Sequence, residues 1–238
     1  MKNVFTLIFI GIICLFRVSA QKIIEKNFDY TNQHIELDVK FARNIEVKTW
    51  EKSTVYFKAT IEIEDAQFIE KYSVDFQQSS NNIVIEEKAE PVYKAMQDYY
   101  KKNNKGNSQH WYNTGDKCKF NYVLYIPKNT RLKISSINGD LKSESMEADM
   151  TTNLINGNID IKDYSGDLDL STINGEIDLK VSNTSLIAET IHGDIYADQK
   201  LNLVSEDRHV GQKVQTDGGN FKNKLRLNTI NGNMYLRL

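Results

Sequence analysis

Carboxylate side chains recur at a fixed spacing in the C-terminal half of the chain, and they are the first candidates for chemistry. Asp160 and Asp178 lie 18 residues apart (178 − 160), and an acid or an amide follows each of four nearby glycines. Aligned carboxylates could bind Ca²⁺, which typically takes six to eight oxygen ligands. The calcium-binding nonapeptide pattern needs G-G-x-G-x-D, however, whereas this chain has single glycines with the acid at another offset. We therefore interpret these acids as a solvated polar face and predict no metal ion. The residues after the glycines are Asp140, Asn158, Glu176 and Asp194.

A second possible chemistry is polysaccharide cleavage, which carboxylate pairs perform in many glycosidases. Asp167 and Asp169 form such a pair, but any acidic strand face produces pairs of this kind. The histidines are scattered without metal-ligand spacing, and the chain has neither an H-E-x-x-H nor a G-x-S-x-G motif. We predict no catalytic residues and no cofactor, and keep a polysaccharide-active enzyme as the alternative. The histidines are His34, His110, His192 and His209.

Aromatic side chains gather in a polar excursion at residues 86–117, and they are the candidate binding residues. Flat amphipathic rings on an exposed segment suit contact with a carbohydrate or a protein. Residues 91–102 can form a short helix with Pro91 in its first turn, and an exposed loop should follow it. The alternative interpretation is a lid whose rings cover an open flank or end of a sheet. The candidate residues are Tyr93, Tyr99, Tyr100, Trp111 and Tyr112.

The elements that must position these groups are indicated by a repeated phrase, which reads INGDL, INGNIDI, INGEIDL, IHGDIYA and INGNMYL in its five copies. Gly139, Gly157, Gly175 and Gly193 are each 18 residues apart (157 − 139, 175 − 157, 193 − 175), and Gly166 lies midway in a half-copy. This period predicts an all-β fold, a single-stranded right-handed β-solenoid whose coils of about 18 residues stack on one another. An ordinary Asn-Gly hairpin is the alternative, but hairpins do not require a strict recurrence.

Alternation within each phrase predicts which side chains face the interior. We expect one buried column of Ile137, Ile155, Ile173 and Ile191, and a second of Leu141, Ile159, Ile177 and Ile195. Asn and Gly tolerate the left-handed conformation of a sharp corner, so we expect them to bend the chain there and the Asn amides to hydrogen-bond up the stack. The expected corner residues are Asn138, Gly139, Asn156, Gly157, Gly166, Asn174, Gly175, Gly193, Asn231 and Gly232.

Residues 1–20 read as a signal peptide, with Lys2, an apolar run at residues 4–16 and the small-residue site Val18-Ser19-Ala20. Residues 21–238 then form one domain, because only two prolines occur and no Pro/Ser linker divides the chain. Export to the periplasm, the cell surface or the medium follows, with no transmembrane segment after signal removal. The exported chain would retain one cysteine, Cys118, most simply as a buried thiol in a strand, with pairing between chains as the alternative.

Charge excludes one class of partner. Removal of Lys2 and Arg17 leaves 28 basic residues (30 − 2) against 32 acidic ones. With a slight excess of acid and no basic stripe, the chain lacks the features of a nucleic-acid-binding protein.

The repeated phrases, together with NIEVKTWEKSTVYFKATI at residues 44–61 and YIPKNTRLKISSINGDL at residues 125–141, resemble the bacterial putative adhesin family, a β-solenoid domain of unknown function. The resemblance covers most of residues 35–238, and the excursion at 86–117 departs from it. It implies a non-enzymatic cell-envelope protein that binds an envelope protein or a glycan, and it brings no catalytic residues. An accessory role in envelope-stress signalling is a further alternative.

Overall fold

A computed structural model of the chain describes residues 20–103, 117–206 and 208–238. The predicted signal peptide, except Ala20, therefore lies outside the described residues. The fold is all-β as predicted, because most segments alternate apolar and polar residues with period two. In β4 (Thr54–Ile63) every second side chain is buried and the others are half-buried.

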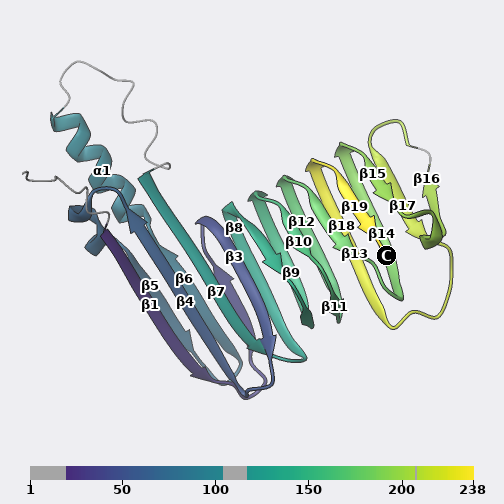
Figure 1. Ribbon diagram of the computed structural model, residues 1–238, viewed down its shortest axis with the longest axis horizontal. Helices are drawn as coiled ribbons and strands as arrows, with labels where there is room; N and C mark the ends of the chain where they lie inside the picture. The colour runs from purple at the N-terminus through teal and green to yellow at the C-terminus, as the bar shows by residue number, and fades with distance from the viewer. Residues whose placement is uncertain (1–19, 104–116, 207) are drawn as a thin grey trace, which may run out of the picture.

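Two rows of hydrogen-bonded strands enclose a single hydrophobic core (Figure 1). The first row runs β5-β6-β2-β8-β9-β12-β18-β14-β17-β16. The second row runs β1-β4-β7-β3-β8-β10-β13-β19-β15. The long strand β8 belongs to both rows, because it passes through the corner at Gly139.

The N-terminal strands are β1 (Ala20–Asp29), β2 (His34–Asp38), β3 (Phe41–Trp50), β4 (Thr54–Ile63), β5 (Ser73–Gln78), β6 (Asn82–Lys88) and β7 (Cys118–Pro127). The following strands are β8 (Thr130–Ser143), β9 (Met146–Asn156), β10 (Ile159–Ile161), β11 (Tyr164–Ser165), β12 (Leu168–Asn174) and β13 (Ile177–Lys180). The last are β14 (Thr184–His192), β15 (Ile195–Ala197), β16 (Leu203–Glu206), β17 (Gln212–Thr216), β18 (Asn223–Asn231) and β19 (Met234–Arg237). The helices are η1 (Ala66–Lys71), α1 (Glu90–Asn103) and η3 (Gln199–Leu201).

The central strands are parallel and stack with a register of 18 residues. Ile159 in β10 lies beside Leu141 on one side and Ile177 on the other. In the first row Leu168 of β12 lies beside Met150 of β9 with the same offset. All five side chains are at most 2% exposed, so their contacts form the core between the two rows.

The sheet is mixed, which differs from the single-stranded solenoid predicted for residues 21–238. Antiparallel pairs occur at both ends of the molecule: β1 with β4, β4 with β7, β5 with β6, β14 with β17 and β16 with β17. Only residues 79–81 connect β5 to β6, and so short a connection permits an antiparallel hairpin but not a parallel crossover. The N-terminal strands therefore form a mixed sheet, with parallel and antiparallel pairs, that continues into the parallel stack.

The C-terminal strands are inserted into the stack. Leu225 of β18 lies between Leu168 of β12 and Leu186 of β14. In the second row β19 likewise lies between β13 and β15. The expected adjacency of the coils that contain Gly175 and Gly193 is therefore wrong, because the C-terminal coil separates them.

The corner glycines do not have the conformation that we expected. Among the corner residues only Gly139 and Gly166 have positive φ, at 135° and 132°, and the corner asparagines have none. Gly157 and Gly175 are needed for a different reason. A Cβ on Gly157 would overlap the carbonyl oxygen of Gly139, and one on Gly175 would overlap that of Gly157. Glycine is required at these corners because successive backbones touch there.

Candidate functional site

The outer face of the first row carries a ladder of exposed isoleucines. Ile155, Ile173, Ile230 and Ile191 are 39–46% exposed, and Ile137 is half-buried. They occupy matching positions on the parallel strands β8, β9, β12, β18 and β14, because the residues that flank them pair in register. The prediction that this column lies in the interior is wrong. We call these five residues the isoleucine ladder.

Threonine takes the interior place that we expected for isoleucine. Thr172, Thr229 and Thr190, each directly before a ladder isoleucine, are 2–4% exposed. Each hydroxyl donates to a glycine carbonyl of the neighbouring coil, as from Thr172 Oγ1 to Gly157 O at 2.9 Å. A satisfied hydroxyl can be buried at little cost. Alternation then turns the following isoleucine outward. The second predicted column is inward-facing, with Leu141, Ile159 and Ile177 buried and Ile195 partly buried.

Two shallow cavities lie along the ladder, with volumes of about 360 and 260 Å³. Both are lined by Ser171 and Ile173, so they form one continuous groove. Uncharged side chains stand two residues before each of Ile137, Ile155, Ile173 and Ile230. The charged residues Asp38 and Lys40 line one end of the groove, and Glu189 and Arg208 line the other. The uncharged border residues are Ser135, Asn153, Ser171 and Asn228.

The corner asparagines border the ladder on its other side. Asn156 Nδ2 donates to Asn138 Oδ1 at 3.0 Å, Asn174 Nδ2 donates to Asn156 Oδ1 at 2.8 Å, and Asn231 Nδ2 donates to Asn174 Oδ1 at 2.7 Å. These amides are exposed, and each links two coils. The ladder is therefore an apolar stripe with amides on one side and mainly uncharged amides and hydroxyls on the other. Asp38 and Glu189 occupy the two ends of the second column.

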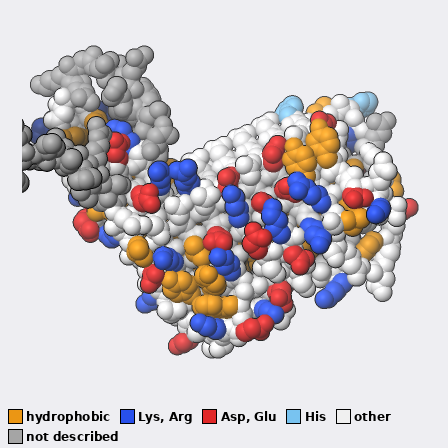
Figure 2. Space-filling view, viewed as in Figure 1, with side chains coloured by type: hydrophobic (Ala, Val, Ile, Leu, Met, Phe, Trp, Pro, Cys, Tyr) orange, Lys and Arg blue, Asp and Glu red, His pale blue; other side chains and the backbone are white. Residues whose placement is uncertain are grey.

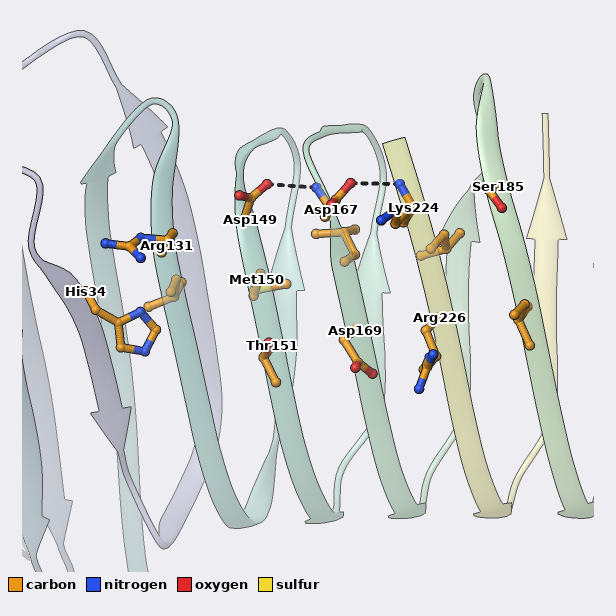
Figure 3. Close-up of a pocket in the computed structure, with 14 residues that line it drawn as sticks. His34, Arg131, Asp149, Met150, Thr151, Asp167, Asp169, Ser185, Lys224 and Arg226 are labelled. Atoms are coloured by element: carbon orange, nitrogen blue, oxygen red, sulfur yellow. Dashed lines mark hydrogen bonds between the residues drawn. The ribbon is translucent and has the colours of Figure 1, made fainter. Parts of the chain in front are cut away.

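At the other end of the same strands the face carries charges of both signs (Figure 3). A groove of about 610 Å³ crosses β2, β8, β9, β12, β18 and β14. Arg131, Lys224 and Arg226 line it together with Asp149 and Asp169. Asp149 Oδ1 accepts the amide of Asp167 at 2.9 Å, and Asp167 Oδ1 accepts the amide of Lys224 at 2.8 Å. These two carboxylates therefore already hold neighbouring coils together.

The acids that follow the corner glycines have the same structural role. Asp140 Oδ1 accepts the amide of Asn158 at 2.9 Å, and Asn158 Oδ1 accepts that of Glu176 at 2.8 Å. Each side chain thus bonds the same position of the next coil. Asp160 pairs with Lys162, and Asp178 pairs with Arg237. Within residues 20–103, 117–206 and 208–238 no three His, Cys, Asp or Glu side chains come together in a way that could hold a metal ion.

The structure describes three of the five predicted aromatic binding residues, all on α1, and places them differently from one another. Tyr93 packs on Phe41, with ring centroids 4.8 Å apart, and burial raises its pKa. The Tyr100 hydroxyl accepts a hydrogen bond from Lys117 Nζ at 3.0 Å. Tyr99 is 41% exposed and contacts Phe68 edge-on. Trp111 and Tyr112 lie outside the described residues.

The inner side of α1 covers the N-terminal end of the core (Figure 1). Val92 and Met96 are fully buried, and the Met96 sulfur lies 3.7 Å from Cys118 Sγ. Burial raises the pKa of the Cys118 thiol to about 11. This thiol is therefore both enclosed and protonated at neutral pH, which matches the buried-strand interpretation. The described part of the excursion has the geometry of a lid.

Neither groove was found from the sequence, although one signal pointed to the ladder. Four of the five repeated phrases have Ser or Thr directly before Ile, and the fifth has Leu154 there, so two adjacent residues compete for the interior. The small polar residue is the one that can bond a carbonyl across the coil, and this decides which of the two turns inward. The charged groove depends on strand neighbours that are 57 residues apart, such as Asp167 and Lys224.

Comparison with known proteins shows the fold. No protein-family model and no curated relative matches the chain. The structure of a "putative cell adhesion protein" from Clostridium sporogenes is similar over 92% of this chain and 99% of that chain, with a TM-score of 0.54 and 12% identity. At this identity the likeness shows a shared fold alone.

Two more distant structures are named "putative adhesin". That from Parabacteroides distasonis covers 74% of this chain and 62% of its own, with a TM-score of 0.35 and 13% identity. That from Bacteroides fragilis covers 90% and 97%, with a TM-score of 0.33 and 10% identity. These two are too distant to support an argument. The helices of the described residues are too short or too polar to cross a bilayer.

Proposed function

We propose that the protein is an exported binding module of the cell envelope, without enzymatic activity, and that the isoleucine ladder is its contact surface for an envelope protein or a glycan. The fold shared with a protein named for cell adhesion supports this class of function. The resemblance of the repeated phrases to the adhesin family supports it independently. We also infer that the parallel stack from β8 onward is a right-handed solenoid whose coils present this surface.

The ladder is the observation that carries the proposal. Exposed aliphatic side chains occur singly on most surfaces, whereas a contiguous apolar stripe marks an interaction site. Here five isoleucines align across five strands, and the side chains beside the middle of the stripe are uncharged, with charged residues only at its two ends. Depletion of charge around an apolar centre is typical of the core of an interface. The neighbouring amides and hydroxyls can both donate and accept hydrogen bonds, which suits polypeptide and sugar hydroxyl groups alike.

The test compares two double variants of the chain from Gln21 to Leu238. In the first, Ile155 and Ile173 are each replaced by Asp, which places charge in the stripe. In the matched control, Thr151→Asp is combined with Asp169→Asn on the same two strands but outside the ladder. All four side chains point outward, so we expect both variants to fold. Circular dichroism and thermal melting check this.

Binding is then measured by pull-down from envelope extracts and on a glycan array. We expect the ladder variant to lose roughly tenfold or more in affinity, because one desolvated charge in an interface core costs several kcal/mol. The control should bind like the unchanged protein. Equal binding by both variants would move the contact surface elsewhere. Release of reducing ends from polysaccharides by the unchanged protein would instead support the enzymatic alternative.

A further inference from the structure

Three aromatic rings form a cluster on the outer face of the second row, away from the ladder. The ring centroid of Trp50 lies 5.0 Å from that of Tyr125 and 6.4 Å from that of Tyr56, and the two tyrosines are 5.9 Å apart. They come from β3, β4 and β7, where the alternate residues Phe57 and Leu124 are fully buried in the core. The three rings therefore point outward and are half-buried. We call this cluster the aromatic platform.

The polar atoms of the platform are held by neighbours. Trp50 Nε1 donates to the carbonyl of Thr54 at 2.7 Å, and the Tyr56 hydroxyl donates to Glu25 Oε1 at 2.9 Å. These bonds fix two of the rings in place. What remains for a ligand is ring surface, because the indole N–H and one phenol hydroxyl are engaged.

Charged groups of both signs surround the rings. Lys52 Nζ lies 4.6 Å from the Trp50 ring centroid, and Lys48 Nζ lies 5.5 Å from that of Tyr125. Lys48 also pairs with Glu46 at 2.8 Å. Lys52 is exposed and has no carboxylate within 4.0 Å among the described residues. Figure 2 shows hydrophobic side chains gathered low on the N-terminal half of the face in view, with Lys or Arg side chains beside them.

Contacts between side chains on neighbouring strands stabilise a sheet by about 0.2–1 kcal/mol for each pair. This stabilisation is a sufficient reason for two neighbouring rings. Three rings with their polar atoms held and donors and acceptors at the margin also match the composition of a ligand site, in which aromatic surface is combined with a few polar groups. The ammonium groups near the ring faces disfavour a cationic ligand, since like charges would be brought together. The mixed signs of Lys48, Lys52 and Glu25 do not select an anion.

A sugar satisfies this combination of features. The carbon-bound hydrogens of a pyranose ring can lie on an aromatic face, whose electron density is negative. Sugar hydroxyls donate and accept hydrogen bonds, so they can use lysine and glutamate at the margin together. We propose that the aromatic platform is a binding site for a neutral saccharide. This site does not depend on the isoleucine ladder, because the two lie in different rows of strands.

The test uses Trp50 as a reporter. The chain contains two tryptophans, so Trp111→Phe leaves Trp50 as the only tryptophan, whose fluorescence can be excited selectively. This variant is titrated with neutral oligosaccharides built from glucose, mannose, galactose, xylose or N-acetylglucosamine. We expect at least one of them to change the Trp50 emission in a saturable manner. No change with any of the five at millimolar concentration would overturn the proposal.

Substitutions at Tyr125 locate the effect. In the same background Tyr125→Leu keeps an apolar side chain without a ring and should weaken saccharide binding roughly tenfold or more, as loss of an aromatic contact does in other interfaces. Tyr125→Phe keeps the ring and should bind within a factor of about two. Equal binding by the Leu and Phe variants would contradict the proposal, provided that both melt like the parent.

The ladder variant with Ile155→Asp and Ile173→Asp separates this proposal from the proposed function. It should retain saccharide binding at the platform even where it loses its envelope partner. Loss of the saccharide signal in that variant would show that the platform is not the site.

Discussion

Asn231 Nδ2 donates a hydrogen bond to Asn174 Oδ1 at 2.7 Å, although 57 residues separate them. The same bond joins corners that are 18 residues apart elsewhere in the stack. The C-terminal coil has therefore taken the place beside β12 and β13 that chain order would give to β14 and β15. As a result, among the described strands β14 is joined to the rest of the parallel stack only through β18.

We expect the last two coils to fold as one unit with the C-terminus. Truncation after Asn220 removes β18 and β19, so β14 and β15 lose their parallel neighbours and expose Leu186 and Ala188. Amide hydrogen exchange should then become fast in β14–β17 and stay slow in β8–β10, because distant coils do not contact the deleted strands. Slow exchange in β14 after truncation would contradict the insertion.

A matched pair of point variants tests the same insertion without truncation. Leu227 of β18 is fully buried, and Leu227→Ala should lower the free energy of unfolding by about 2–5 kcal/mol. Arg226→Ala on the exposed side of the same strand should change it by less than about 0.5 kcal/mol. Chemical denaturation of both variants measures the difference.

The sequence predicts the features that depend on the 18-residue period. It does not predict which of two adjacent residues faces inward, or which strands far apart in the chain become neighbours. The 18-residue spacing is sufficient for the register of Leu141, Ile159 and Ile177, because stacked strands repeat at one chain length. It cannot tell whether Thr172 or Ile173 faces inward, since adjacent residues have opposite phases and both are acceptable inside. The choice depends on a hydrogen bond from Thr172 to a carbonyl of another coil.

The insertion of β18 and the aromatic platform could not be predicted from the sequence for the same reason. Gly193 and Gly232 are 39 residues apart, which is not a multiple of 18, and that interval does not reveal which two coils the last one separates. The platform combines Trp50, Tyr56 and Tyr125, which become neighbours only because β7 enters between β3 and β4. Strand order of this kind is set by the packing of the whole sheet. It leaves no local pattern in the chain.

Because successive corners touch, a larger residue in place of a corner glycine should destabilise the protein even where that glycine has no positive φ. Gly175→Ala should lower the free energy of unfolding by about 1–3 kcal/mol, since the added Cβ would overlap the carbonyl of Gly157. Gly218 is the control, because it has φ of 59° and open space around it. Gly218→Asn should change stability by less than about 0.5 kcal/mol, since Asn tolerates that conformation. If thermal melting shows both variants to be equally stable, the contact between corners does not require glycine.

The acids of the outer face are expected to act as hydrogen-bond acceptors and not as calcium ligands. Asp140→Asn keeps an oxygen for the Asn158 amide and should melt like the unchanged protein. Asp140→Ala loses that bond and should be less stable by about 0.5–1.5 kcal/mol. Millimolar Ca²⁺ or a chelator should leave the melting temperature unchanged, since a ligand of the folded state would raise it by mass action. A calcium-dependent rise that is lost in Asp140→Asn would reverse this assignment.

We expect the buried side of α1 to stabilise the fold. Met96 is fully buried, so Met96→Ala should lower the free energy of unfolding by about 2–5 kcal/mol. Gln97→Ala, on the exposed side of the same helix, should be within about 0.5 kcal/mol of the unchanged protein. Replacing residues 90–116 with a Gly/Ser linker should therefore destabilise the N-terminal strands. A linker variant with unchanged thermal melting would show that α1 is dispensable and free to serve binding.

Glu87 should make stability depend on pH. Its side chain is 1% exposed, and burial raises its pKa to about 7, with Glu90 adding to the effect and the hydrogen bond from the Phe41 amide opposing it. The folded state therefore binds this proton more tightly than the unfolded chain, whose glutamate has a pKa of 4.5. Stability from the protonated form is complete below pH 4.5 and is lost as the pH rises through about 7.

We expect the Glu87 contribution to the free energy of unfolding to fall by about 3 kcal/mol between pH 4.5 and pH 8, since each pKa unit corresponds to about 1.4 kcal/mol. Urea denaturation at pH 5, 6, 7 and 8 measures the total slope, and Glu87→Gln isolates the contribution. The amide keeps an oxygen for the Phe41 N–H and cannot ionise, so the variant should be the more stable protein at pH 8 and should show a flatter profile. Parallel profiles for the two proteins would mean that Glu87 is not the group that titrates.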